Sequence, residues 1–262
     1  MFDSSSLHAL PVEAVPASAR ERLGAMTPIM PDLFAKTDTW VFDLDNTLYP
    51  PHSDLWPKID HRITVFLAHL LDLDGLSARA LQKHYYQRYG TTLNGLMAEH
   101  ADIINADRFL DFVHDIDRTT LMIDDRLGAA IERLPGRRLV FTNGSRGHAE
   151  KTMLALGIAH HFDAVFDIVA GQFRPKPDPV TYERFLTAHD IDPSRAVMFE
   201  DIARNLEPPK HLGMRTVLVV PRAGGTDHRD PWEQANTAPS YIDHVTDDLA
   251  GFLDAVAGGL GL

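Results

Sequence analysis

One short stretch constrains the fold of this chain more than any other. Residues 40–45, WVFDLD, have the pattern of a short apolar strand that leads directly into two carboxylates, Asp43 and Asp45. Because side chains alternate across a strand, these two carboxylates lie on the same side. Like charges this close repel each other, so the pair requires a cation, a shared proton or both. The stretch therefore predicts a buried strand that ends in a charged site.

Two other interpretations of the acidic stretch require no active site. An EF-hand calcium loop needs Gly at its sixth position and Glu at its twelfth, where this chain has Leu48 and Asp54. A turn, in which Asp and Asn side chains cap the backbone, is the other interpretation. The acidic stretch alone does not distinguish a turn from a functional site. The other segments of the chain are needed to choose between them.

Composition excludes several classes of protein. The 262-residue chain has a formal net charge of −12, which argues against nucleic-acid polymers and anionic membranes as partners, since both need a basic face. Cysteine is absent, so no disulfide forms, and this fits a reducing compartment. We find neither a signal-peptide pattern nor an apolar run long enough to span a bilayer. We therefore expect a cytoplasmic protein, monomeric or homodimeric, that binds neither membrane nor nucleic acid.

The segment that follows the first strand has a helical hydrophobic period. An apolar stripe with helical spacing begins at Ile59, and Ser77 is placed to cap a second helix. Further helical patterns cover 93–100 and 106–116, and no strand signal interrupts them. We therefore predict an all-helical inserted cap domain over 51–127.

The rest of the chain alternates short apolar runs with helical patterns, which is typical of a parallel sheet buried on both faces. We expect a doubly wound, Rossmann-like α/β core made of 37–50 and 128–262, and a loosely attached leader over 1–36 with a short helix near 17–23. The apolar runs after residue 137 are 139–141, 164–169, 196–199 and 216–220, with 241–245 as a candidate edge strand.

Polar residues follow each of these strands, where the sites of open parallel sheets lie. The second strand is followed by Thr142 and Asn143, and a lysine held between two prolines, Lys176, follows the third. The fourth ends in a second carboxylate pair, Glu200 and Asp201. Hard oxygen ligands suit Mg²⁺, and a lysine with backbone amides suits a phosphate. Together, the carboxylates, the hydroxyl and amide groups and the lysine indicate phosphoryl transfer.

These four segments resemble, in order and spacing, the four motifs of haloacid-dehalogenase superfamily phosphatases. The resemblance implies that Asp43 attacks phosphorus to form an aspartyl-phosphate and that Asp45 protonates the leaving oxygen and then activates water. It also implies that Thr142 and Asn143 bind the phosphoryl oxygens and that Lys176 neutralises the charge of the nucleophile and the phosphate. The implied Mg²⁺ ligands are Asp43, the backbone carbonyl of Asp45, Asp201 and, as a further candidate, Glu200. Many members have a further Asp where this chain has Asn205, so we assign that residue an indirect role.

The inserted domain has its own candidate residues. Gly90 and Gly95 bracket a stretch that we interpret as a loop facing the site. The candidates for substrate recognition are Thr91, Thr92, Asn94, His100 and His114. Turn-forming or capping roles remain the alternative for each. These segments resemble the pyrimidine 5′-nucleotidase branch of the superfamily, which implies hydrolysis of UMP- or CMP-like monophosphates.

Three alternatives remain open from the sequence. The first is a phosphatase of another small phosphate, such as a sugar phosphate or phosphoglycolate. The second is a sugar-phosphate mutase, which releases little free phosphate. The third is a nucleotide-binding regulator, although a binding protein has no need of the nucleophile and proton shuttle that Asp43 and Asp45 provide.

Overall fold

The core of the protein is a six-stranded parallel sheet. We describe a computed structural model of the chain, which covers residues 31–234 and 239–262. The strands lie in the order β3-β2-β1-β4-β5-β6, and every neighbouring pair is parallel. Their bounds are β1 Thr39–Phe42, β2 Arg137–Phe141, β3 Ala164–Phe166, β4 Ala196–Glu200, β5 Arg215–Val219 and β6 His244–Thr246. The predicted doubly wound α/β fold is confirmed, with β1 near the middle of the sheet.

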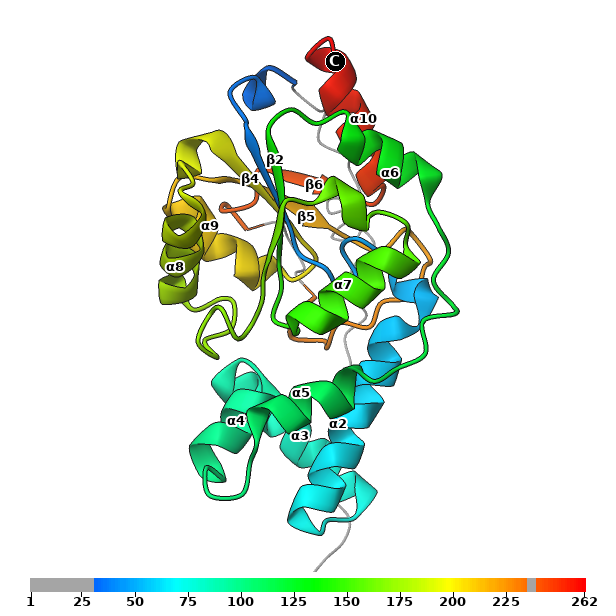
Figure 1. Cartoon of the computed structure of the whole chain (residues 1–262), viewed down its shortest axis with the longest axis vertical. Helices are drawn as coiled ribbons and strands as arrows, with labels where there is room; N and C mark the ends of the chain where they lie inside the picture. The colour runs from blue at the N-terminus through cyan, green and yellow to red at the C-terminus, as the bar shows by residue number, and fades with distance from the viewer. Residues whose placement is uncertain (1–30, 235–238) are drawn as a thin grey trace, which may run out of the picture.

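Helices cover both faces of the sheet (Figure 1). One face packs against α6 Asp125–Glu132, α7 Arg146–Ala155 and α10 Leu249–Gly259, and the other against α8 Pro179–His189 and α9 Glu207–His211. Alternation along β1 explains this arrangement, because Trp40 and Phe42 point to the first face and Val41 to the second. A strand buried on both faces holds its end rigidly, which is what a site at that end requires.

Two strands are clearly shorter than the sequence predicts. The run 164–169 is a strand only as far as Phe166, because the Asp167 side chain accepts hydrogen bonds from the backbone N–H groups of Arg146 (2.8 Å) and Ala170 (2.9 Å) and turns the chain. The edge strand begins at His244, later than predicted. There Asp243 Oδ2 accepts from the backbone N–H of Thr216 at 3.0 Å, so a side chain occupies the position of a ladder partner.

A bundle of four helices lies beyond one end of the sheet (Figure 1). Its members are α2 Leu55–Leu71, α3 Gly75–Tyr89, α4 Thr92–Glu99 and α5 Ala106–His114, and they share a separate apolar cluster. The cap predicted for α3 was wrong. Asp74, not Ser77, caps this helix, because its carboxylate accepts from the backbone N–H groups of Leu76 and Ser77. Short 3₁₀ helices complete the chain at Pro31–Phe34, Pro51–Ser53, Ala159–His161, Pro193–Arg195 and Ala203–Leu206.

The predicted domain borders differ from the packing at two places. Phe34, which we placed in the leader, is fully buried, and its ring centroid lies 6.2 Å from that of Trp40 and 5.8 Å from that of Phe252. The border after residue 127 falls inside α6, which packs on α10 of the core. The leader's first thirty residues, including the helix predicted near 17–23, lie outside the described residues.

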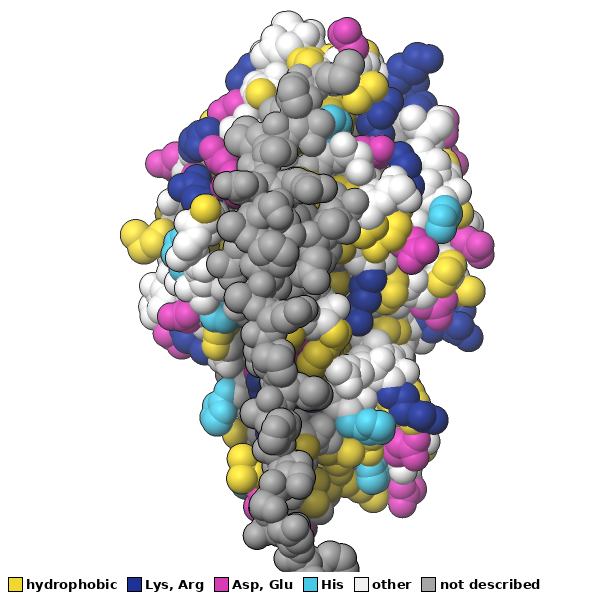
Figure 2. Space-filling model, turned by 180° about the vertical axis from the view of Figure 1, so that it is seen from behind, with side chains coloured by type: hydrophobic (Ala, Val, Ile, Leu, Met, Phe, Trp, Pro, Cys, Tyr) yellow, Lys and Arg dark blue, Asp and Glu magenta, His cyan; other side chains and the backbone are white. Residues whose placement is uncertain are grey.

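Two surface properties bear on possible partners. Within the described ranges, no helix is both long and apolar enough to cross a membrane. On the face seen in Figure 2, basic and acidic side chains are intermixed along both flanks.

Candidate active site

A buried group of three carboxylates lies where β1 and β4 end. Asp43 follows β1, and its backbone N–H donates to the carbonyl of Phe199 at 2.9 Å, which fixes it beside the end of β4. Carboxylate oxygens of Asp43, Glu200 and Asp201 lie within 4.8 Å of one another, and all three side chains are buried. Three hard oxygen donors at this spacing fit a divalent cation such as Mg²⁺.

Lys176 supplies the positive charge at this centre. Its ammonium donates to Asp43 Oδ1 at 2.7 Å, to Glu200 Oε2 at 2.6 Å and to the carbonyl of Phe141 at 2.9 Å. The side chain is 1% exposed, so water does not screen these contacts. All three N–H donors of the ammonium are engaged, so the charge of Lys176 is what remains to act on an anion bound beside it.

The pKa values of the centre reflect crowded negative charge. Burial, then the charge of Glu200, raises the pKa of Asp43 to about 8, although Lys176 opposes the shift. Burial and the same neighbour raise the pKa of Asp201 well above its ordinary value. Burial alone would lower the pKa of Lys176, but the two carboxylates beside it raise it instead. A bound cation would relieve this repulsion between carboxylates.

Asp45 is held by a network that the sequence analysis missed. Its Oδ1 accepts from the Tyr49 hydroxyl at 2.5 Å and lies 2.9 Å from His148 Nε2. Arg118 donates to His148 Nδ1 at 3.0 Å, so Nε2 carries the hydrogen that points to Asp45. Burial would raise the pKa of Asp45, but the neighbouring His148 and the hydrogen bond of Tyr49 lower it.

The two partners of Asp45 lie close to the predicted motifs in the sequence. Tyr49 follows Asp45 by four residues, and His148 is in the first turn of the helix that begins after the Thr142 motif. The contact of His148 with Asp45 could not be predicted, because it joins segments 103 residues apart.

The turn after β2 holds the lysine segment beside the cavity. The Asn143 side chain accepts from the backbone N–H of Lys176 at 2.8 Å and donates to its carbonyl at 3.2 Å. It therefore holds the lysine segment, where we expected contact with phosphoryl oxygens. Thr142 Oγ1 accepts from the backbone N–H of Gly144 at 2.9 Å, and a Cβ on Gly144 would lie 3.1 Å from His148. A side chain at this position would therefore push His148 away by a few tenths of an ångström.

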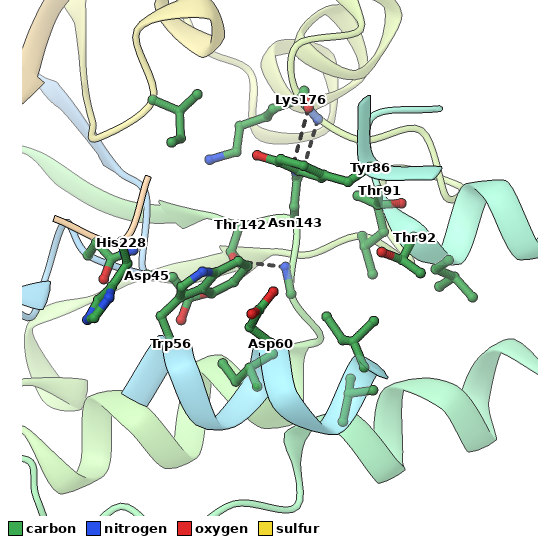
Figure 3. A pocket seen from close by; sticks show the side chains of 18 of the residues that line it. Asp45, Trp56, Asp60, Tyr86, Thr91, Thr92, Thr142, Asn143, Lys176 and His228 are labelled. Carbon is green, nitrogen blue, oxygen red and sulfur yellow. Dashed lines mark hydrogen bonds between the residues drawn. The ribbon is translucent and has the colours of Figure 1, made fainter. Parts of the chain in front are cut away.

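A cavity of about 160 Å³ separates the core centre from the cap. Figure 3 shows core residues Thr142, Asn143 and Lys176 on one side and cap residues Trp56 and Asp60 on another. All of the core residues predicted as site residues line this cavity. They are Asp43, Asp45, Thr142, Asn143, Lys176, Glu200 and Asp201, and Asn205 lines it as well.

Only some of the cap residues predicted from the sequence line the cavity. Thr91, Thr92 and His114 line the cavity, whereas Asn94 and His100 are not among its lining residues. His100 Nε2 lies 2.8 Å from the Tyr85 hydroxyl, inside the cap.

The predicted loop over these residues was wrong. Thr91 caps α4 by accepting from the backbone N–H of Asn94 at 3.2 Å, so the helix already contains Asn94 and Gly95. Gly95 is a packing residue, since a Cβ there would lie 2.3 Å from the Tyr85 ring.

A second group of lining residues comes from a segment with no predicted role. The connection between β5 and β6 contributes His228, Arg229, Asp230 and Glu233 to the cavity wall. We call residues 221–234 the strap. Its signal in the sequence was length, because connections longer than about 12–15 residues are uncommon and often functional.

The family of this chain can now be assigned. The profile of the haloacid dehalogenase-like hydrolases matches residues 37–213. The chain belongs to this hydrolase family. The predicted superfamily is thereby confirmed.

Individual relatives are distant. Phosphate metabolism protein 8 of Saccharomyces cerevisiae is 26% identical over 206 residues, which cover 73% of this chain and 64% of that protein, less than two thirds of its length. Validoxylamine A 7′-phosphate phosphatase of Streptomyces hygroscopicus subsp. limoneus is 24% identical over 191 residues, 66% of this chain and 81% of that protein. The solved HAD phosphatase of Thermococcus onnurineus has a TM-score of 0.54 and 16% identity over 85% of this chain and 99% of its own. That likeness supports the fold.

Proposed function

We propose that this family member is a Mg²⁺-dependent phosphomonoesterase that works through an aspartyl-phosphate, and that it hydrolyses pyrimidine nucleoside 5′-monophosphates. The observation that carries the proposal is the convergence of Asp43, Lys176, Glu200 and Asp201 in one buried centre beside Asp45. A nucleophile, a proton donor and cation ligands meet there, which is the set that phosphoryl transfer uses.

In the first step, a carboxylate oxygen of Asp43 attacks phosphorus, and the bond from phosphorus to the ester oxygen breaks. The pKa of Asp45 is lowered in the free site, and the negative charge of the bound phosphate would raise it, so the carboxyl carries a proton in the ester complex. The leaving oxygen takes this proton, so the product alcohol departs uncharged. Lys176 keeps the attacking carboxylate in place and offsets its charge. The result is an acyl phosphate on Asp43.

In the second step, water attacks that phosphorus while Asp45, now deprotonated, accepts the proton from the water. Inorganic phosphate leaves and Asp43 is restored. Both hydrogen bonds to the Asp45 side chain go to Oδ1, and within the described residues its Oδ2 has no protein partner. Tyr49 and His148 therefore orient the carboxyl group while one oxygen remains available for proton transfer.

The acidic group fits the ion that the mechanism needs. Asp43, Glu200 and Asp201, with the backbone carbonyl of Asp45, would hold Mg²⁺, which when bound neutralises charge on the phosphoryl oxygens. Removal of the divalent cation with a chelator should therefore abolish activity, and added Mg²⁺ should restore it.

Two features support a nucleoside as the leaving group. The cap presents the aromatic side chains of Trp56 and Tyr86 to the cavity, and such rings can stack on a base (Figure 3). Thr91, Thr92 and His114 add groups able to hydrogen-bond a base or ribose. With the resemblance to the nucleotidase branch, they favour UMP- or CMP-like substrates.

A phosphate-release screen tests the proposal. Nucleoside and sugar monophosphates are assayed with Mg²⁺ and with a chelator, and we expect the highest kcat/KM for UMP or CMP. A preference for purine or sugar esters would contradict the nucleotidase assignment and leave the mechanism intact. Release that is insensitive to the chelator would contradict the metal assignment.

A second candidate is a phosphatase of another small ester, including sugar phosphates and phosphoglycolate. It is favoured by the relative named as a phosphatase of validoxylamine A 7′-phosphate. The same screen separates the two. Product analysis separates hydrolysis from a mutase, and binding without turnover would identify a nucleotide-binding regulator.

A further inference from the structure

The strap connects the cap to the core around the cavity. Asp230 of the strap lies 2.8 Å from the ammonium of Lys83 on α3, and Glu233 accepts from the hydroxyl of Tyr86 on the same helix. Glu233 also pairs at 3.0 Å with Arg204, which belongs to the core. The strap is therefore part of the wall around the leaving group and brings two carboxylates to it.

Its other end reaches the metal carboxylates and the linker to the cap. Arg229 donates to the backbone carbonyl of Asp201 at 3.3 Å, and His228 Nε2 lies 2.9 Å from the carbonyl of Pro51. Since a carbonyl can only accept, this histidine nitrogen is the donor.

The cations that line the cavity are already paired with carboxylates. Among the described residues these cations are Lys83, Lys176 and Arg229. Lys83 lies 2.8 Å from Asp230 and 3.6 Å from Asp60, and both carboxylates line the cavity as well.

The other two cations are engaged in the same way. Arg229 donates to both oxygens of Asp227, at 2.9 and 2.8 Å. Lys176 is held by Asp43 and Glu200 in the catalytic centre. On the cap and strap side, no lining cation of the described chain is left without a carboxylate partner.

This arrangement has a direct consequence for the ester that binds. A carboxylate or second phosphate on the leaving group would lose its water and find no free cation, while facing Asp60, Asp230 and Glu233. Hydroxyl and N–H groups, in contrast, can donate to those carboxylates. The wall thus discriminates by charge as well as by shape.

We propose that the strap and the cap together select phosphomonoesters whose leaving group carries no negative charge and offers O–H or N–H donors. The inference rests on the proposed phosphomonoesterase function and narrows its substrate class. It also separates the open alternatives, because phosphoglycolate carries a carboxylate on its leaving group, whereas a nucleoside or neutral sugar does not.

Matched ester pairs test this selection. UMP is compared with orotidine 5′-monophosphate, which adds one carboxylate to the base, and glycerol 3-phosphate with 3-phosphoglycerate. We expect kcat/KM to be roughly tenfold or more lower for the carboxylate member of whichever pair is hydrolysed, as like-charge repulsion requires. Equal kcat/KM values within a pair would overturn the inference and leave phosphatase activity standing.

Variants assign the effect to the wall. Asp230→Asn should raise the ratio of orotidine 5′-monophosphate to UMP hydrolysis by roughly fivefold, because it frees part of the Lys83 charge. The matched control is Asp254→Asn, which alters an ion pair with Arg133 on the core surface and should leave the ratio unchanged. An unchanged ratio in folded Asp230→Asn, checked by its thermal melting, would contradict the role of the strap.

A binding measurement separates failure of this inference from failure of the proposed function. Titration calorimetry of both nucleotides with the Asp43→Asn variant compares their affinities without turnover. If the wild type released phosphate from no ester, the proposed function would be wrong, and the affinity ratio would still test selection by charge. Weaker binding of orotidine 5′-monophosphate than of UMP supports the inference, and equal binding contradicts it.

Discussion

The two halves of the site are built in different ways. The core half takes its side chains from the ends of strands buried on both faces, and its lysine is 1% exposed. The cap half takes its polar side chains from helices and from the strap, and Lys83 there is 26% exposed. The core half is shielded from water, whereas the cap half is partly solvated.

The difference indicates how the work is divided. Charges in the core half act at short range in a shielded environment, where each contact has a large effect. Contacts in the cap half are individually weaker, and in our proposal they select among esters. Substitutions in the core half should therefore change the rate of the chemical step and the stability, whereas those in the cap half should change substrate preference and KM.

The largest effect is expected from Lys176→Met. The substitution leaves Asp43 and Glu200 buried without their cation, so turnover should fall by about 10³-fold or more. The free energy of unfolding should fall by about 3–5 kcal/mol, as when one partner of a buried ion pair is removed. Phosphate release and denaturant unfolding, the latter with a chelator present, measure the two losses.

The control for this substitution is Lys210→Met. Lys210 pairs with Asp243 at the partly exposed edge of the sheet. Its loss should cost at most about 1 kcal/mol and leave turnover unchanged. Equal losses of turnover and stability in the two variants would contradict the claim that the buried ion pair matters more than the surface one.

Asp45→Asn should have the next largest effect. Loss of the general acid and base should lower kcat/KM for alkyl phosphates by about 10²–10⁴-fold without preventing folding. The loss should be smaller for p-nitrophenyl phosphate, because its leaving group needs no proton. Wild-type activity of this variant on alkyl esters would refute the assigned role.

Tyr49→Phe should have a moderate effect. The variant keeps the buried ring but removes the hydroxyl that donates to Asp45 at 2.5 Å, a hydrogen bond to a charged group worth about 1.5–3 kcal/mol. We expect kcat/KM to fall by roughly tenfold, with KM little changed. A change in KM alone would indicate that the hydroxyl contacts substrate and does not orient Asp45.

The smallest effect is expected in the cap. Tyr86→Phe removes the hydroxyl that donates to Glu233, so KM should rise by about two- to fivefold while kcat stays the same. The matched control is Tyr89→Phe, whose hydroxyl bonds Glu99 within the cap and which does not line the cavity. A large fall in kcat for Tyr86→Phe would contradict the claim that the cap half affects substrate binding and not the chemical step.

The difference between the core half and the cap half also explains which site residues could be predicted from the sequence. Residues at the ends of successive parallel strands meet at one edge of the sheet, so the order Asp43, Thr142, Lys176 and Asp201 was enough to predict a shared centre. Their hydrogen-bond partners were not predictable in detail. Asn143, for example, accepts a hydrogen bond from the backbone of the lysine segment.

The cap half was less predictable because helical packing decides which residues face the cavity. Thr91 and Thr92 line it while Asn94 does not, although all three are close neighbours in the sequence. The strap has no strong periodicity. Its contacts with Lys83 and Tyr86 span 147 residues, a distance over which no local pattern carries information.

The central claim is that Asp43 receives the phosphoryl group, and trapping that group tests it most directly. The wild-type enzyme is mixed with substrate and Mg²⁺, quenched rapidly in acid, digested and analysed by mass spectrometry. We predict one added phosphoryl group on the peptide that contains Asp43, and none in Asp43→Asn, which should also release no phosphate. Phosphate release by Asp43→Asn at the wild-type rate, or a phosphoryl group trapped on another residue, would contradict the account.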